Sequence, residues 1–199
     1  MKLIFFIKSS TVNFSRYTIK DIPGSSGRLD VISRCILSAL TNGNDLEEDI
    51  QIWVFLDKYG AYIFDSKFFK NKTFPKSEIL LTDYFVDFIK RTSRTVKYID
   101  NPLNSIKRSK LGFFDAIKKF DKNQYHIYVL NEKGENFNEI ITKIKSRDKL
   151  LFIIGDQSGD LLDNKELKNM NLINLSLGDR SYLASSTIRL IKMNLGLII

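Results

Sequence analysis

Three short turns in the second half of the chain each place a glycine at or just after the end of a strand-like run. They are residues 130–134 (Leu-Asn-Glu-Lys-Gly), 155–160 (Gly-Asp-Gln-Ser-Gly-Asp) and 176–181 (Ser-Leu-Gly-Asp-Arg-Ser). Ligands of open α/β sheets collect where the strands end. Glycine lets backbone N–H and C=O groups approach a ligand closely, which suits recognition of an adenine edge and a ribose. Because a glycine after a strand is also ordinary turn chemistry, each turn alone is a weak signal.

The sequence gives little support to metal, disulfide, ATP or nicotinamide chemistry. It contains neither a phosphate loop ending in Gly-Lys-Ser nor a Gly-x-Gly-x-x-Gly fingerprint. Cys35 and His126 are the only residues of their types, so we predict no disulfide framework and no metal site. Cys35 falls in a helical pattern, which favours a small buried hydrophobe. His126 falls in a strand-like run, which favours a packed or surface side chain over a catalytic one.

The net charge of +8 is concentrated in one segment. Residues 90–122 hold 10 basic and 3 acidic side chains, whereas residues 1–89 hold 11 of each and residues 123–199 hold 10 and 9. Such a segment could attract phosphate backbones and release counterions on binding. Charge alone leaves a solvated, lysine-rich face as the alternative.

The elements that must position these residues follow from hydrophobic patterning. We expect strands at residues 3–7, 50–56, 61–64, 125–130, 150–154 and 172–175, and helices at 28–41, from about 81 to 91, at 112–120, at 137–145 and from about 182. Residues 21–27 and 94–109 are expected to form loops. Strands alternating with helices favour an α/β fold with an open, mainly parallel sheet and helices on both faces. Without repeats or linkers, residues 1–199 are expected to form one domain.

Composition sets the remaining bounds. The chain has 199 residues, of which 43% are hydrophobic and 27% charged, as in soluble globular domains. The early apolar run at residues 3–7 is too short to span a bilayer and follows no leader pattern, so we expect a cytoplasmic protein with no membrane partner. The last helix is apolar on more than one face, which predicts that it packs deep in its own domain or against a second copy.

Four motifs follow one another along the chain. They are Ile22-Pro-Gly-Ser-x-Gly-Arg-Leu-Asp30 continuing into Arg34-Cys35, then Leu111-Gly112-Phe113 opening a helix, then Phe152-Ile-Ile-Gly-Asp-x-x-Gly159, and finally Ile173-x-Leu175-Ser176 through Leu183-Ala184. In this order and spacing they resemble the archaeal tRNA pseudouridine N1-methyltransferases, a branch of the SPOUT superfamily. The likeness covers nearly the whole chain.

The resemblance implies a C-terminal trefoil knot folded around S-adenosylmethionine, a homodimer with residues of both subunits in each active site, and methylation of pseudouridine 54 in tRNA. The three turns fall where the knot would hold the cofactor, so the expected cofactor contacts are Leu130, Asn131, Gly155, Asp156, Gly159, Leu175, Ser176, Leu177, Gly178 and Leu183. The apolar last helix falls where a dimer would bury it. The expected tRNA phosphate contacts are Arg91, Arg94, Lys107, Arg108 and Lys110.

The expected chemistry requires N1 of pseudouridine to lose its proton and attack a methyl group held in line on sulfur. Arg28 could stabilise negative charge on the uracil carbonyls, while Asp30 could orient Arg28 or accept a proton. A salt bridge between these two residues at the start of a helix is the structural alternative.

The third candidate catalytic residue, Thr187, stands where the related enzymes carry a cysteine. A threonine can hydrogen-bond but is a far poorer nucleophile than a thiolate. Methyl transfer does not inherently need a covalent protein intermediate. Other departures from the family pattern are Gln157-Ser158 in place of His-Ile and Ser109-Lys110 in place of Arg-Arg. Two alternatives stay open: methylation of a pseudouridine in ribosomal RNA, and an RNA-binding homologue that has lost turnover.

Overall fold

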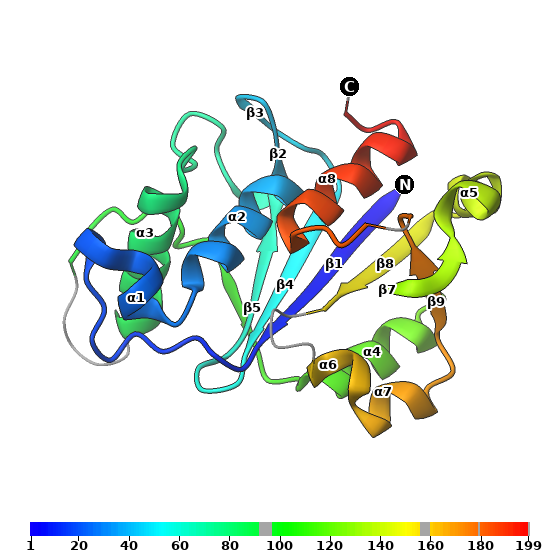
Figure 1. Ribbon diagram of the computed structural model, residues 1–199. Helices are drawn as coiled ribbons and strands as arrows, with labels where there is room; N and C mark the ends of the chain where they lie inside the picture. The colour runs from blue at the N-terminus through cyan, green and yellow to red at the C-terminus, as the bar shows by residue number, and fades with distance from the viewer. Residues whose placement is uncertain (92–96, 156–159, 179, 199) are drawn as a thin grey trace.

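A computed structural model describes residues 1–91, 97–155, 160–178 and 180–198. Its main sheet has the strand order β6-β5-β4-β1-β8-β7-β9 (Figure 1). β1 pairs in parallel with β4 and β8, and β7 with β8 and β9, whereas β5 pairs antiparallel with β4 and β6. The predicted α/β fold with a mainly parallel sheet is confirmed. The elements are β1 Lys2–Ser9, η1 Ile19–Asp21, α1 Ile22–Ser26, α2 Leu29–Leu40, β2 Thr41–Asn42, β3 Asp45–Leu46, β4 Ile50–Leu56, β5 Gly60–Asp65, η2 Ser66–Phe68, α3 Glu78–Lys90, β6 Lys107–Ser109, α4 Phe113–Lys122, β7 His126–Asn136, α5 Phe137–Lys145, β8 Lys149–Ile154, α6 Asp160–Asp163, α7 Lys165–Asn169, β9 Ile173–Ser176 and α8 Ala184–Leu195.

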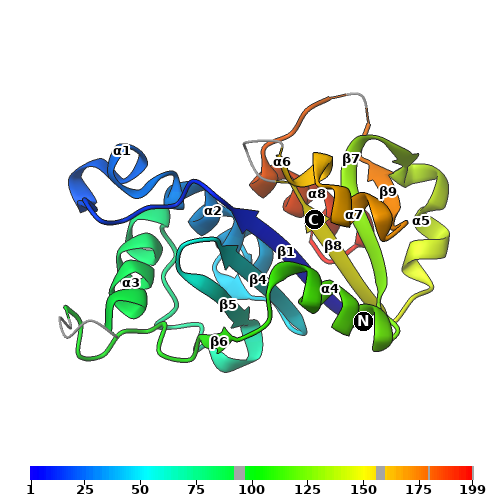
Figure 2. The same ribbon diagram turned by 90° about the horizontal axis from the view of Figure 1, so that it is seen from below.

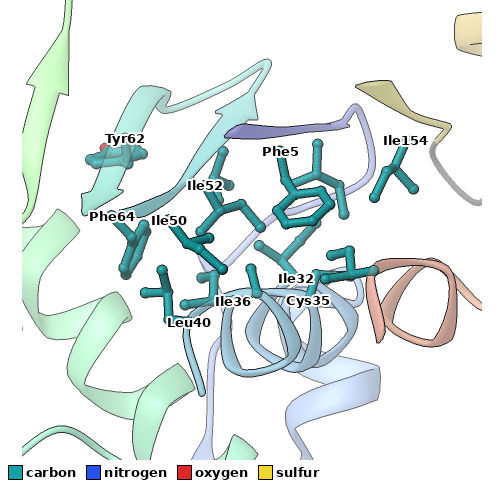
Figure 3. Close-up of a cluster of buried hydrophobic side chains, with 14 of the residues drawn as sticks. Phe5, Ile32, Cys35, Ile36, Leu40, Ile50, Ile52, Tyr62, Phe64 and Ile154 are labelled. Atoms are coloured by element: carbon teal, nitrogen blue, oxygen red, sulfur yellow. The ribbon is translucent and has the colours of Figure 1, made fainter. Parts of the chain in front are cut away.

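Helices cover both faces of the sheet, because its central strands are apolar on both sides. Alternate residues of β1 point to opposite faces. Phe5 packs toward α2, α3, α5 and α8, in the cluster that also buries Cys35 (Figure 3). Phe6 packs toward α4, α6 and α7, where it meets Trp53 with ring centroids 5.5 Å apart. Cys35 has no exposed surface, as its helical position predicts.

The expectation of a loop at residues 21–27 is wrong for most of that stretch, which forms α1. Asp21 caps this helix, with its Oδ1 accepting from the Gly24 amide at 3.1 Å, and Pro23 lies in the first turn, where its missing N–H costs nothing. Arg28 then adopts a left-handed conformation with φ of 69° and begins α2. Ser26 helps to start α2, because its Oγ accepts from the Leu29 amide at 3.0 Å.

The last helix packs on α2 through Ile188, Ile191 and Leu195, all of which are buried. Lys192 lies on the same face, also fully buried. Its ammonium donates to the carbonyls of Ser38, Ala39 and Thr41 at 2.9–3.2 Å and pairs with Glu47 at 2.8 Å. These carbonyls form the negative end of α2, so the lysine fixes α8 against that helix. In the described ranges no helix has both the length and the apolar character that a bilayer crossing needs.

Candidate functional site

A pocket of about 430 Å³ is lined by residues from the middle of β7 and from the carboxyl ends of β8 and β9, together with residues of α6 and the start of α8. Figure 2 shows these elements on the same side of the molecule. This volume suits a small organic ligand, and the position is the usual one for ligands of open α/β sheets. All three glycine-bearing turns contribute to its wall. The lining residues are Leu130, Asn131, Glu132, Lys133, Ile154, Gly155, Leu162, Leu175, Leu177, Gly178, Arg180, Ser181, Tyr182, Leu183, Ala184 and Thr187.

The sequence suggested that the first turn follows the end of a strand. The structure shows instead that this turn is a bulge within β7. Both Leu130 and Glu135 pair with Leu175 of β9, so the residues between them are pushed out of the ladder toward the pocket. Gly134 closes the bulge against β9. A Cβ at this position would meet the Leu175 amide nitrogen and would lie 2.5 Å from the Asn174 carbonyl carbon. Two strand segments on the same partner therefore hold the bulge in place.

Described residues of the second and third turns also line the pocket; they are Gly155 from the second turn, and Leu177, Gly178, Arg180 and Ser181 from the third. Gly155 follows Ile154 directly, and a Cβ there would lie 3.7 Å from Cγ of Leu162, at the edge of the pocket. In the third turn, Ser176 lies outside the pocket lining and shapes the turn from behind. Its Oγ accepts from the Gly178 amide at 3.2 Å and lies 3.1 Å from the Gly178 carbonyl oxygen. Gly178 has φ of 114°, a conformation that L side chains rarely adopt.

The structure brings most of the expected cofactor contacts together. Leu130, Asn131, Gly155, Leu175, Leu177, Gly178 and Leu183 line the pocket, as does Thr187 near the start of α8, whereas Asp156 and Gly159 lie outside the described residues.

Sequence reasoning missed other lining residues, among them the charged Glu132, Lys133 and Arg180. These three stood within the recognised turns, so proximity to the glycines was the available signal. Leu162 and Tyr182 had no comparable signal. The wall therefore combines apolar side chains with charges of both signs, and this suits a ligand that has an aromatic base and a charged end.

Arg28 and Asp30 form the salt bridge that was the structural alternative, and neither is among the pocket-lining residues. Arg28 donates from Nε and Nη2 to the two carboxylate oxygens of Asp30 at 3.1 Å each, and Arg34 adds a further contact at 3.1 Å. Hydrogen bonding to Asp30 raises the pKa of Arg28 above its ordinary value. The Asp30 side chain is buried and that of Arg28 is half-exposed, so the carboxylate holds the guanidinium in a fixed orientation at the start of α2.

The expected phosphate contacts divide into two groups. Arg91 donates to Asp87 at 3.1 Å and to the Tyr98 carbonyl, and Arg108 donates to the Ile89 carbonyl at 3.1 Å, so both hold α3 in place. Lys107 and Lys110 are exposed on and just beyond β6. Arg94 lies outside the described residues.

Within the described part of the chain, no group of three or more His, Cys, Asp and Glu side chains is arranged to hold a metal ion. His126 is half-buried in β7, where burial lowers the pKa of its imidazole.

The fold and this pocket define an α/β protein with a candidate small-ligand site at the carboxyl edge of a mainly parallel sheet. Residues 1–196 match the family described as "Putative SAM-dependent RNA methyltransferase", and the chain belongs to this family.

The chain is similar to archaeal proteins named tRNA (pseudouridine(54)-N(1))-methyltransferase. The one from Methanococcus maripaludis is 31% identical over 176 residues, which cover 88% of this chain and 76% of the relative. The one from Thermococcus onnurineus is 26% identical over 193 residues, with 92% of each chain covered. The fold resembles the crystal structure of Archaeoglobus fulgidus Nep1 bound to S-adenosylhomocysteine, with a TM-score of 0.59, 14% identity, and 98% and 97% of the two chains covered.

Proposed function

We propose that this protein transfers a methyl group from S-adenosylmethionine to N1 of pseudouridine 54 in tRNA. The observation that carries the proposal is the meeting of the three glycine-bearing turns in one pocket, in a chain that belongs to a family of S-adenosylmethionine-dependent RNA methyltransferases. The relatives that cover most of the chain bear the name of this activity.

The lining residues fit this cofactor. The apolar side chains of Leu130, Ile154 and Leu177 suit the faces of an adenine ring, and the absence of a side chain at Gly155 leaves room for close backbone approach. The Glu132 carboxylate can accept hydrogen bonds from ribose hydroxyls, while Arg180 can pair with the carboxylate of the methionine part. When bound, the cofactor supplies an electrophilic methyl group on a sulfonium centre.

The protein's own residues position the acceptor base and stabilise its negative charge. Arg28, held by Asp30, would neutralise charge that spreads over the uracil carbonyls as N1 loses its proton. Because its carboxylate oxygens already accept from two guanidinium groups, Asp30 acts here as the orienting group. Thr187 lines the pocket with a hydroxyl that can hydrogen-bond, which is sufficient where methyl transfer is direct.

The proposal includes a single SPOUT domain with a C-terminal trefoil knot, a homodimer and a cytoplasmic location, where tRNA is available. Two observations support the arrangement of the C-terminal region: α8 returns from β9 to pack on α2, and Met193 and Leu183 stay half-exposed on and beside it. A second copy would cover these side chains. Light scattering of the purified protein tests the dimer, because a monomer at micromolar concentration would contradict it.

The activity is tested with two tRNA transcripts that differ only in whether position 54 is uridine or pseudouridine. Each transcript, and in parallel small-subunit ribosomal RNA, is incubated with the protein and methyl-labelled cofactor, and the nucleosides are analysed by mass spectrometry. We expect labelled N1-methylpseudouridine from the pseudouridine transcript alone. Label in small-subunit ribosomal RNA but not in tRNA would favour the ribosomal enzyme. Cofactor binding without label in either RNA would favour a homologue that has lost turnover.

A further inference from the structure

Residues 66–77 form a basic and aromatic segment at the opposite end of the sheet from the pocket. The segment contains four lysines, three phenylalanines and no acidic residue, although the first 89 residues are neutral as a whole. Its two adjacent phenylalanines have different environments. Phe69 packs between Phe64 and Phe74, with ring centroids 6.2 and 5.0 Å away, whereas Phe68 keeps 40% of its surface exposed. Packing against neighbouring rings therefore accounts for an aromatic residue at position 69, whereas no such packing among the described residues accounts for the exposed ring of Phe68.

Two ammonium groups from different elements lie near the Phe68 ring. Nζ of Lys107, on the edge strand β6, lies 4.1 Å from the ring centroid, and Nζ of Lys67 lies 5.0 Å away. Cations at these distances are attracted to the ring, so the ring and the lysines hold one another in place. Proteins that bind single-stranded nucleic acids combine exposed aromatic rings with nearby cations, because bases stack on the rings while phosphates pair with the cations.

The surrounding charges identify Lys107 as the stronger phosphate contact. Lys67 shares its charge with Asp65, whose carboxylate lies 3.4 Å away. Four acidic residues also line the same groove as Lys67; they are Asp45, Glu47, Glu48 and Asp49. Exposed lysines also lie along the segment and on and just beyond β6; they are Lys70, Lys72, Lys107 and Lys110.

We propose that Phe68 and Lys107 form an RNA-docking patch, in which the Phe68 ring stacks on an unpaired base and Lys107 contacts an adjacent phosphate. The patch is separate from the pocket, because β6 lies five strands away from β7 and neighbouring strands are about 4.8 Å apart, which gives about 24 Å across the sheet. Only an extended polymer can reach both places. The identification of that polymer as tRNA rests on the proposed function.

The test measures tRNA binding by fluorescence anisotropy at several salt concentrations for four variants. Phe68→Leu keeps an apolar side chain without a ring, and Phe68→Trp keeps the ring. Lys107→Ala removes the proposed phosphate contact. Lys145→Ala is the matched control, because Lys145 is exposed on α5, which packs beside β7 at the other side of the sheet. Calorimetry with S-adenosylhomocysteine verifies that the pocket of each variant is intact.

We expect Phe68→Leu to weaken tRNA binding about tenfold, a loss within the range for one stacked base, and Phe68→Trp to retain the affinity. Lys107→Ala should reduce the slope of log K against log salt by about 0.7–0.9, and Lys145→Ala should leave it unchanged. The patch is rejected if Phe68→Leu binds tRNA as tightly as the wild type, or if the two lysine variants behave alike.

The readouts also separate the patch from the proposed function. Loss of tRNA affinity in Phe68→Leu with no methylation by the wild type would support the patch and reject the activity. Unchanged affinity in that variant with normal methylation would do the reverse.

Discussion

Replacing Gly134 with alanine is predicted to separate β7 from β9 and to deform the pocket. The new Cβ would lie 2.5 Å from the Asn174 carbonyl carbon and against the Leu175 amide nitrogen. Non-bonded carbon atoms are usually about 3.5–4.0 Å apart, so one strand must move by about 1 Å. Both obstacles are backbone atoms of a paired strand, which cannot rotate away as a side chain could.

The expected cost follows from this geometry. Overpacking costs about 1–3 kcal/mol, and because backbone must move we expect about 2–3 kcal/mol here. For a chain of this length, 1 kcal/mol lowers Tm by about 2–4 °C, so Gly134→Ala should lower Tm by roughly 4–12 °C. Leu130 and Leu175 lie on the strands that separate and also line the pocket. We therefore expect the affinity for S-adenosylhomocysteine to fall by about tenfold or more.

Thermal unfolding and calorimetry with S-adenosylhomocysteine measure the two effects. Gly112→Ala is the matched control, since a Cβ at Gly112 would lie at an ordinary 3.6 Å from the Asp115 carboxylate. The control should keep the affinity close to wild type and lower Tm by less than Gly134→Ala does, because the only expected cost is that of an alanine at the N-cap of α4. A Gly134→Ala protein with unchanged Tm and unchanged affinity would refute the bulge as the element that shapes the pocket.

Three further predictions follow from buried groups. Lys192→Met removes the ammonium that pairs with Glu47 and with the carbonyls at the end of α2. Because these buried groups then lack a partner, the free energy of unfolding should fall by about 3–5 kcal/mol. Burial lowers the pKa of Lys192 below its usual 10.5, so the unfolded protein binds this proton more tightly than the folded protein does. The stability of the wild type, measured by urea titration, should therefore rise relative to that of the variant as the pH increases toward 10.5. Burial raises the pKa of the Cys35 thiol to about 12; iodoacetamide should modify it only in denaturant, and rapid modification of the native protein would contradict this. Asp30→Asn should lower methyl transfer while leaving affinity for S-adenosylhomocysteine intact, because Asp30 holds Arg28 outside the pocket lining; loss of cofactor affinity would argue against this division of roles.

Hydrophobic periodicity predicted those elements that have an uninterrupted apolar stripe. The strand at residues 50–56 and the helix at residues 137–145 have the bounds that the sequence indicated. The prediction failed where local residue types oppose the tertiary context. Pro23 and Gly24 are typical of loops, yet Asp21 caps a short helix there. Residues 131–134 are typical of a turn, yet pairing with β9 on both sides makes them a bulge within β7.

The pocket was only partly predictable for a related reason. Glycine at the strand ends indicated the three turns, because glycine reports a backbone requirement that is local in sequence. The contributions of Leu162 and Tyr182 depend on where α6 and α8 pack, which no local pattern encodes. Lys192 is one of several polar residues in the last helix, and nothing in the sequence set it apart from the others. Its carbonyl partners lie about 150 residues earlier in the chain, so their contact is visible only in three dimensions.

The most direct test of the central claim is a crystal structure of the protein grown with S-adenosylhomocysteine. We expect density for the adenosyl group in the pocket between the bulge of β7, Gly155 and Leu177, beside the carboxyl ends of β8 and β9. Density for the ligand elsewhere on the protein, or an empty pocket at saturating ligand, would contradict the claim.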